Sequence, residues 1–387
     1  MVKKNNKTKV RKIGIVMMGG GARAAYQVGV LRAISDMRPK NSPTPFQIIS
    51  GTSAGAINAV SLACEAGNFH LAVVRINHVW RNFEIHQVFR GDLRGIFSTL
   101  MKWLRIRLFS SPDKINPLYL LDRKPLCKLL NKYLVFNDIQ KGIDNNHIHA
   151  ISVTASGYSS GQSVTFYQAN ESAKRWVRAR RVGCREDITI EHLMASSAIP
   201  LMFAPVRINR EYFGDGSMRQ MAPLSATLHL GADRILIIGN RDEEVEPARS
   251  DETIEKPSLS QIAGHVINSI FLDSLEADIE RLERINKTVS LIPDNILKQK
   301  NIGLRKVESL LISPSADLGD MAQPYFKKLP FSLRLLLGNV GSKKEQGSSL
   351  VSYLMFDKTY CRSLIRLGYK DAMAKRVQIE HLLRDED

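Results

Sequence analysis

A serine stands between two glycines at the point where an apolar segment gives way to a run of small residues. The motif is Gly51-Thr52-Ser53-Ala54-Gly55, with Phe46 to Ile49 before it and small residues as far as Ala63 after it. This order predicts a strand, a sharp turn and a helix, with the serine at the apex. Glycine suits both flanking positions, Gly51 and Gly55, because the backbone of such an elbow is strained and the strand nearly touches the helix. A serine in this setting can act as a nucleophile, although the five-residue pattern also occurs in ordinary strand-to-helix turns.

A second glycine motif precedes the serine. Gly19, Gly20 and Gly21 follow the apolar segment Ile13 to Met17 and precede a helical pattern. Their backbone N–H groups suit the pyrophosphate of a dinucleotide, but such a site needs an acid at the end of the next strand, which ends here in Ser50-Gly51-Thr52-Ser53. The alternative is an oxyanion hole, whose N–H groups face the carbonyl oxygen that Ser53 attacks. We favour the oxyanion hole, because adjacent parallel strands would bring both loops to the same edge of a sheet.

A serine nucleophile also needs a base. The histidines late enough in the chain for a serine, acid and histidine order are His192, His229, His265 and His381. None of them stands in a polar loop that contains glycine, so we expect structural roles for all four. Asp215 lies between Gly214 and Gly216 at the end of an apolar strand, where a carboxylate can approach another loop closely. We therefore predict Asp215 as the base, with an aspartate that caps a glycine turn as the alternative.

The length and composition limit the class of protein. A chain of 387 residues with 44% hydrophobic content predicts one large α/β domain with insertions, or a domain with an appendage. Four widely spaced cysteines, without a C-x-x-C pair or matching histidines, argue against zinc and against a disulfide framework. No segment resembles a secretory signal or approaches the roughly 20 apolar residues that cross a bilayer. We expect a cytoplasmic protein, at most held on the inner face of the membrane.

The formal net charge of +17 is concentrated in three segments, residues 1–12, 86–110 and 171–185. Such segments favour a polyanion, either an anionic lipid surface or nucleic acid. In the second segment apolar residues recur at steps of three and four, which predicts a cationic amphipathic helix. This helix is either a lid packed on the core or an interfacial membrane helix. No nucleic-acid-binding motif accompanies the charge, so we expect contact with an anionic membrane and no nucleic acid.

The order of elements predicts an α/β fold. A strand at Ile13 to Met17, a helix at Ala22 to Met37 and a strand at Phe46 to Ser50 are typical of the opening of a parallel sheet. His149 to Ser156 and Gln162 to Gln168 predict a hairpin or two adjacent strands, and Val206 to Phe213 and Arg234 to Gly239 predict two further strands. Prolines break the region 69–146 into short helical pieces. We divide the chain into a basic tail (1–12), a catalytic domain (13–240) with a helical insertion or lid (69–146), and a mainly helical C-terminal region (241–387).

Four motifs together resemble those of the patatin-like phospholipases. They are Gly19-Gly20-Gly21-Ala22-Arg23, Gly51-Thr52-Ser53-Ala54-Gly55, Ala195-Ser196-Ser197-Ala198-Ile199-Pro200 and Asp215-Gly216. Their order and approximate spacing match the family over about residues 13–240. The resemblance implies a three-layer α/β/α core with a mainly parallel sheet, and a hydrolase that uses a serine and an aspartate.

Carried over by position, Ser53 is the nucleophile and Asp215 the base. The N–H groups around Gly19, Gly20 and Gly21 form the oxyanion hole, and Arg23 braces that loop. Asp215-Gly216-Ser217 departs from the family's usual Asp-Gly-Gly or Asp-Gly-Ala, which puts the loop geometry in question but not the acid.

The resemblance implies a lipid acyl hydrolase that cleaves fatty-acyl esters of phospholipids or related lipids through an acyl-enzyme intermediate. It implies no metal and no cofactor. A protein that keeps the fold and binds lipids or polyanions without catalysis is the alternative, although both reactive residues are present. The head group, acyl position, chain length and oligomeric state stay open at this point.

Overall fold

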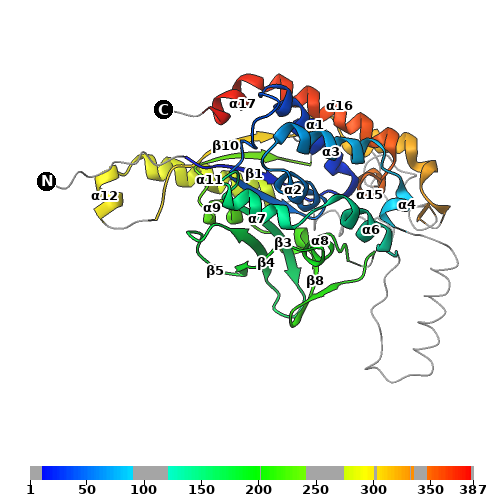
Figure 1. The fold of residues 1–387 in the computed structure, drawn as a ribbon, viewed down its shortest axis with the longest axis horizontal. Helices are drawn as coiled ribbons and strands as arrows, with labels where there is room; N and C mark the ends of the chain where they lie inside the picture. The colour runs from blue at the N-terminus through cyan, green and yellow to red at the C-terminus, as the bar shows by residue number, and fades with distance from the viewer. Residues whose placement is uncertain are drawn as a thin grey trace, which may run out of the picture.

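A computed structural model describes residues 11–89, 121–200, 202–240, 274–299, 303–331, 333–334 and 347–384. In these residues ten strands form one sheet with helices on both faces (Figure 1). The first half of the sheet is parallel, in the order β10-β9-β1-β2-β3. Its strands are β1 (Ile13–Met17), β2 (Ile48–Thr52), β3 (Ala150–Gly157), β9 (Arg234–Ile238) and β10 (Glu308–Ile312).

The parallel strands are buried along their whole length except β10, which explains the nearly continuous apolar sequences of β1 and β9. Met17 of β1 pairs with Gly51 of β2, so the two strands end side by side. The glycine loop after β1 and the turn after β2 therefore meet at one edge of the sheet, as the sequence predicts.

The second half of the sheet is mostly antiparallel. It contains β4 (Ser163–Ala169), β5 (Trp176–Arg178), β6 (Arg181–Arg185), β7 (Val206–Ile208) and β8 (Glu211–Asp215). β3 and β4 form the predicted hairpin, and β8 pairs with the end of β3, where Ala155 lies opposite Asp215. The single strand predicted for Val206 to Phe213 is wrong, because the chain reverses between β7 and β8. Asn209 takes a φ of 53° at this turn, a conformation that asparagine tolerates better than most residues.

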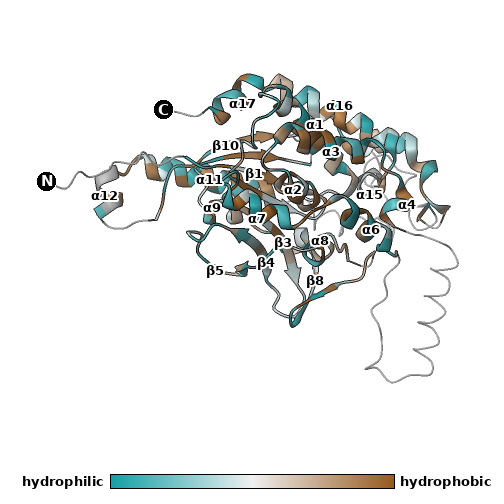
Figure 2. Cartoon of the chain, viewed as in Figure 1, coloured by the Kyte–Doolittle hydropathy of each residue, from teal (hydrophilic) through white to brown (hydrophobic). Residues whose placement is uncertain are grey.

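Alternate residues of the central strands pack into two separate apolar layers. Ile15 and Met17 of β1 belong to the larger core with α1 (Ala25–Asp36) and α2 (Ala54–Cys64). Val16 belongs to the smaller core on the opposite face, with residues of α9 (Ser225–His229) and α11 (Ser274–Ser290). The fold is therefore the expected three-layer α/β/α arrangement, and Figure 2 shows apolar residues concentrated on its central strands and inner helices.

Helices of the region 69–146 contribute buried residues to the larger core. They are α3 (Phe69–Arg81), α4 (Ile85–Val88), α6 (Lys124–Tyr133) and α7 (Asn137–Asp144). α8 (Ile190–Ser196) lies beside β3 and β8, and short helical turns follow the glycine loop at η1 (Gly21–Ala24) and Asp215 at η3 (Gly216–Arg219). In α6, Leu126 and Leu130 are buried while Lys128 and Lys132 are exposed, so one face packs inward and the other meets solvent.

The region beyond residue 240 adds a strand as well as helices. β10 extends the sheet next to β9, and α16 (Lys358–Ala374) packs along α1 (Figure 1). Gly29 and Gly368 lie where these helices cross, since a Cβ at either residue would overlap the backbone of the other helix. The other elements are α12 (Asp294–Gln299), α13 (Leu318–Ala322), η4 (Gln323–Lys328), α15 (Gly347–Leu354) and α17 (Arg376–Leu383).

Two of the three cationic segments lie largely outside the described residues. Of the basic tail 1–12 only Arg11 and Lys12 are described, and of the amphipathic helix expected at 86–110 only residues 86–89. The third segment, 171–185, forms the hairpin of β5 and β6, with Trp176 stacked on Tyr167 at 5.0 Å between ring centroids. No helix in the described part of the chain is long and apolar enough to cross a membrane.

Candidate active site

Ser53 stands alone between the end of β2 and the start of α2. Its φ of 53° and ψ of −126° are strained for a residue with a side chain. Only glycine fits at the two flanking positions, because a Cβ there would overlap neighbouring backbone atoms. A Cβ at Gly51 would lie 2.5 Å from the carbonyl oxygen of Gly55, and a Cβ at Gly55 would overlap the Met17 carbonyl. The two glycines thus allow the strand, the turn and the glycine loop to pack tightly around Ser53.

Asp215 reaches Ser53 from the end of β8. The Ser53 hydroxyl donates a hydrogen bond of 2.6 Å to Oδ2 of Asp215, and the backbone N–H of Ser217 donates to Oδ1 at 2.9 Å. Asp215 is fully buried, and Gly216 lets its loop approach the Thr154 carbonyl, which a Cβ at this position would overlap. The structure thus joins two residues that lie 162 positions apart.

Burial sets the proton affinity of Asp215. Desolvation raises the pKa of its carboxyl to about 6, although the hydrogen bonds from Ser53 and Ser217 and the charge of Arg123 act in the opposite direction. A pKa near 6 leaves the carboxylate ionised at neutral pH, yet makes it a stronger base than an exposed aspartate.

Arg123 is a buried cation close to this carboxylate that the sequence did not reveal. Its Nη1 donates to the Met194 carbonyl at 2.7 Å and to Ser197 Oγ at 3.2 Å, and Nη2 donates to the Ala204 carbonyl at 2.9 Å. Burial lowers the pKa of its guanidinium to about 10, while the charge of Asp215 raises it. Arg123 precedes α6 in a segment without a motif, so no local signal distinguishes it from the other basic residues.

The Ser196-Ser197 pair at the end of α8 supports the elbow. Ser196 Oγ accepts a hydrogen bond of 2.8 Å from the backbone N–H of Ser53 and donates one of 2.6 Å to the Thr154 carbonyl. Its hydroxyl therefore ties Ser53 to β3, next to the strand that carries Asp215. The motif Ala195 to Pro200, to which the sequence assigned no role of its own, thus contributes a residue that contacts Ser53.

The glycine loop lies directly against Ser53. A Cβ at Gly19 would fall 3.0 Å from the Ser53 Cβ and 2.5 Å from Ser217 Oγ, so a side chain there would displace the serine. Gly21 has a φ of 54°, and its Cβ would overlap the Tyr353 carbonyl of α15. Asn240 donates from Nδ2 to the Gly19 carbonyl. Gly19 and Gly21 are thus confined between the elbow and the C-terminal region.

Arg23 braces this loop from behind. Its backbone N–H donates to the Gly20 carbonyl at 3.0 Å, and its Nε donates to Ser352 Oγ at 2.6 Å. The guanidinium also lies 4.5 Å from the centre of the Tyr353 ring. Arg23 therefore binds the loop to α15.

A chain of buried amides holds the other side of the loop. Gln27 Nε2 donates to the Met18 carbonyl at 2.6 Å, and Asn58 Nδ2 donates to Gln27 Oε1 at 2.9 Å. Trp80 Nε1 in turn donates to Asn58 Oδ1 at 2.8 Å. These bonds connect the glycine loop with α2 and α3, and none of the three residues is predicted from the sequence.

The described histidines that were candidate bases contact residues other than Ser53. His192 bonds to Thr189 and Glu186, His229 bonds to the Ser225 carbonyl, and His381 pairs with Glu308. His265 lies outside the described residues. Within the described ranges, no group of three or more His, Cys, Asp or Glu residues could hold a metal ion.

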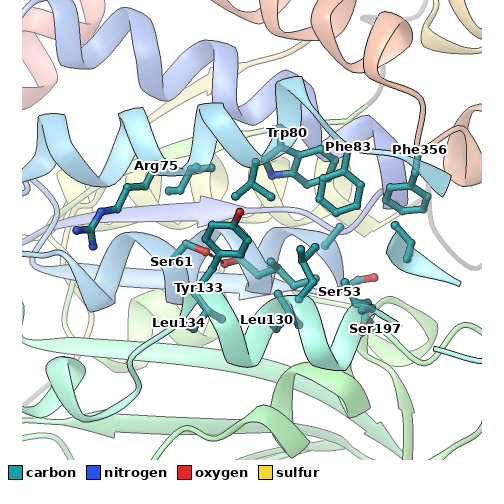
Figure 3. A pocket seen from close by; sticks show the side chains of 18 of the residues that line it. Ser53, Ser61, Arg75, Trp80, Phe83, Leu130, Tyr133, Leu134, Ser197 and Phe356 are labelled. Atoms are coloured by element: carbon teal, nitrogen blue, oxygen red, sulfur yellow. Dashed lines mark hydrogen bonds between the residues drawn. The ribbon is translucent and has the colours of Figure 1, made fainter. Parts of the chain in front are cut away.

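An apolar cavity begins at Ser53 and extends between α2, α3 and α6 (Figure 3). Its empty volume is about 1020 Å³, part of which is open to solvent. Phe83 and Phe356 lie near Ser53, whereas Arg75 lies at the far end, as Figure 3 shows. Most of the lining consists of aliphatic and aromatic side chains, so the cavity suits a long apolar ligand.

The fold and the site define an α/β protein in which a serine at a strained turn donates a hydrogen bond to a buried carboxylate. The family model described as "Patatin-like phospholipase" matches residues 15–228, which is more than half of the chain. The chain belongs to this family of lipid hydrolases.

Individual relatives are distant. An alignment 77 residues long, which covers 18% of this chain, is 36% identical to a protein named lysophospholipase nte1 from Aspergillus terreus and covers 5% of that protein. Human GIVD cytosolic phospholipase A2, solved with an inhibitor, shares 11% identity at a TM-score of 0.47, over 99% of this chain and 60% of its own. VipD from Legionella pneumophila shares 13% identity at a TM-score of 0.39, over 96% of this chain and 66% of its own.

Proposed function

We propose that the protein hydrolyses fatty-acyl esters of phospholipids or related lipids, with Ser53 as nucleophile and Asp215 as base. The observation that carries this proposal is the 2.6 Å hydrogen bond from the Ser53 hydroxyl to a fully buried carboxylate. A buried carboxylate with a raised pKa is suited to accept the serine proton.

The reaction follows from these positions. Asp215 takes the Ser53 proton while Oγ attacks the ester carbonyl, and the N–H groups around Gly19, Gly20 and Gly21 stabilise the negative oxygen. The intermediate collapses to an acyl-serine as Asp215 protonates the departing alcohol. Water then gives a proton to Asp215 and attacks the acyl-serine. Collapse of the second intermediate releases the fatty acid, and the proton returns to Ser53.

Two further observations support a lipid substrate. The cavity that begins at Ser53 is lined mainly by apolar side chains, which favours an acyl chain over a polar ligand. In the hairpin of β5 and β6, Arg178 and Arg180 are exposed together with Val177, a combination that suits an anionic membrane surface. Peripheral membrane contact through segments 1–12, 86–110 and 171–185 is part of the proposal.

The test is fatty-acid release from mixed phospholipid vesicles by the parent and by Ser53→Ala. We expect the variant to lose at least about 10⁴-fold in rate, as is typical when a serine nucleophile is removed. Ser290→Ala is a matched control, because Ser290 is an exposed serine at the end of α11. If folded Ser53→Ala released fatty acid as fast as the parent, the proposed nucleophile would be wrong.

The alternative is a lipid- or polyanion-binding protein without catalytic activity. It predicts that the parent binds anionic vesicles but releases no fatty acid from any lipid class offered. Retention of both Ser53 and Asp215 in hydrogen-bonding contact argues against it. A salt series of vesicle and DNA binding separates the partners, because steep salt-dependent binding to DNA without vesicle binding would contradict the membrane proposal.

A further inference from the structure

We propose that the cavity at Ser53 measures the acyl chain and ends at the ion pair of Glu65 with Arg75, so that the protein prefers acyl chains about as long as one membrane leaflet is thick. This inference rests on the proposed function. It names the acyl chain as the part of the substrate that the cavity selects, and Glu65 and Arg75 as the residues that limit the length of that chain.

One wall of the cavity is a row along α2 and its two flanking residues. Ser53, Ile57, Ser61 and Glu65 all line the cavity and follow one another at intervals of four residues. Residues four apart lie on the same helix face and rise by about 6 Å per interval. Ser61 is therefore about 12 Å from Ser53 along the helix axis, and Glu65 about 18 Å.

The same interval recurs in the two helices that complete the wall. Ala72, Ile76 and Trp80 of α3 line the cavity, as do Leu126, Leu130 and Leu134 at α6. All six side chains are apolar or aromatic and at most 8% exposed. Together with the row of α2, these side chains give the cavity a mainly apolar lining, which suits a hydrocarbon chain.

The far end of the cavity is polar and meets solvent, since the side chains of Arg75 and Glu65 are 58% and 24% exposed. Arg75 of α3 forms an ion pair and a hydrogen bond with Glu65, and both residues line the cavity. Figure 3 shows Arg75 at the opposite end from Ser53 and Phe356. A methyl group that reached this pair would remove charged groups from water without offering them a new partner, which is unfavourable. Lengthening the acyl chain beyond this ion pair should therefore give no further gain in affinity.

The length of the row agrees with that of membrane acyl chains. The hydrocarbon core of a bilayer is about 30 Å thick, so the chains of one leaflet occupy about 15 Å, close to the roughly 18 Å between Ser53 and Glu65. Up to that length each methylene that becomes buried can raise kcat/KM by up to about fourfold. We expect the maximum at palmitoyl or stearoyl esters and a decline for arachidoyl esters.

The experiment measures kcat/KM for p-nitrophenyl esters from butyryl to arachidoyl in mixed micelles at a fixed surface concentration. Ser61→Phe places a ring about 12 Å from Ser53 and should move the maximum to octanoyl or decanoyl. We expect the ratio of palmitoyl to butyryl kcat/KM to fall at least about tenfold. Val74→Phe is the matched control, because Val74 is 48% exposed and does not line the cavity.

A second variant tests the polar end and does not depend on filling the interior. Glu65→Ala combined with Arg75→Ala removes both charges, so neither is left without a partner. The ratio of arachidoyl to palmitoyl kcat/KM should then rise several-fold. An equal loss of rate for every ester in Ser61→Phe, or an unchanged ratio in the double variant, would overturn the inference. Butyryl hydrolysis by the parent and its absence in Ser53→Ala would still support the proposed function.

Discussion

The two sides of Ser53 are held by different kinds of neighbour. On the acid side, Asp215 is buried near the guanidinium of Arg123, and burial and charge together set its pKa. On the glycine side, the neutral amides of Gln27 and Asn240 hold backbone carbonyls of the loop, and the guanidinium of Arg23 binds Ser352 of α15. Changes on the acid side should therefore alter the pH dependence of the reaction. Changes on the glycine side should alter its rate at every pH.

The two sides also differ in where their residues lie in the chain. The residues of the acid side lie in the sequence between Arg123 and Ser217, within the segment that the family model matches. The glycine side depends on Ser352 and Tyr353 of α15, more than 300 residues after the loop that they contact. The C-terminal region is thus part of the support of the site and not only an extension of the sheet.

The largest effect should come from replacing the acid. Asp215→Asn keeps the shape of the side chain but removes the base, and we expect kcat to fall by about 10³-fold or more, at the upper part of the range for general bases. Fatty-acid release from phospholipid vesicles measures the loss. Asp233→Asn is a control, because Asp233 immediately precedes β9 and pairs with Arg305. A loss of less than tenfold in folded Asp215→Asn would show that another group removes the serine proton.

The same variant should be more stable than the parent at neutral and alkaline pH. Burial raises the pKa of Asp215 from 3.8 to about 6, so the native state favours the neutral carboxyl and loses stability as pH rises through about 6. Asparagine removes this cost, which is on the order of 3 kcal/mol. Thermal unfolding should show a higher Tm for Asp215→Asn at pH 8, with the difference shrinking towards pH 4.

The positions of Ser53 and Asp215 can be singled out from the sequence because each lies beside local glycines. Gly51 and Gly55 mark the elbow, and Gly214 and Gly216 mark the loop of the carboxylate. Arg123 cannot be predicted in this way, because it contacts residues more than 70 positions away and no motif surrounds it. The same holds for Gln27 and Asn58, which belong to helices whose composition is equally consistent with simple packing.

The strands, too, can be predicted only where the sequence carries a local signal. The continuous apolar sequences of β1 and β9 identify them as buried parallel strands, and their adjacency follows from the parallel sheet. The turn between β7 and β8 was missed because Asn209-Arg210 contains neither glycine nor proline. β10 was also missed, since its partly buried residues follow a polar stretch and its pairing with β9 is made across more than 70 residues.

A smaller effect is expected from the glycine side. Gln27→Leu removes the hydrogen bond to the Met18 carbonyl, so the glycine loop loses a restraint next to Ser53. We expect kcat to fall about tenfold, because a displaced oxyanion donor costs up to about 10² to 10³ and the loop keeps its bond from Asn240. The pH at which kcat/KM reaches half of its maximum should not change, since Asp215 is untouched.

The control for this variant is Gln378→Leu, on the exposed face of α17. A glycine-side variant that moved the pH midpoint would contradict the separation of the two sides. So would a variant that lost activity only in proportion to its loss of folded protein, which circular dichroism and a thermal unfolding curve would reveal.

The smallest effect on rate, and the sharpest test of the comparison, concerns Arg123. Its positive charge lowers the pKa of Asp215, so Arg123→Met should raise that pKa and move the acid limb of the kcat/KM profile to higher pH. Well above the limb, where Asp215 is ionised in both proteins, the rate should differ only a few-fold. Arg123→Lys keeps the charge and should leave the limb near its original pH, even though the bonds to the Met194 and Ala204 carbonyls change. If both variants shifted the limb equally, Arg123 would act through packing and not through its charge. The charge of Arg123 would then no longer distinguish the acid side from the glycine side.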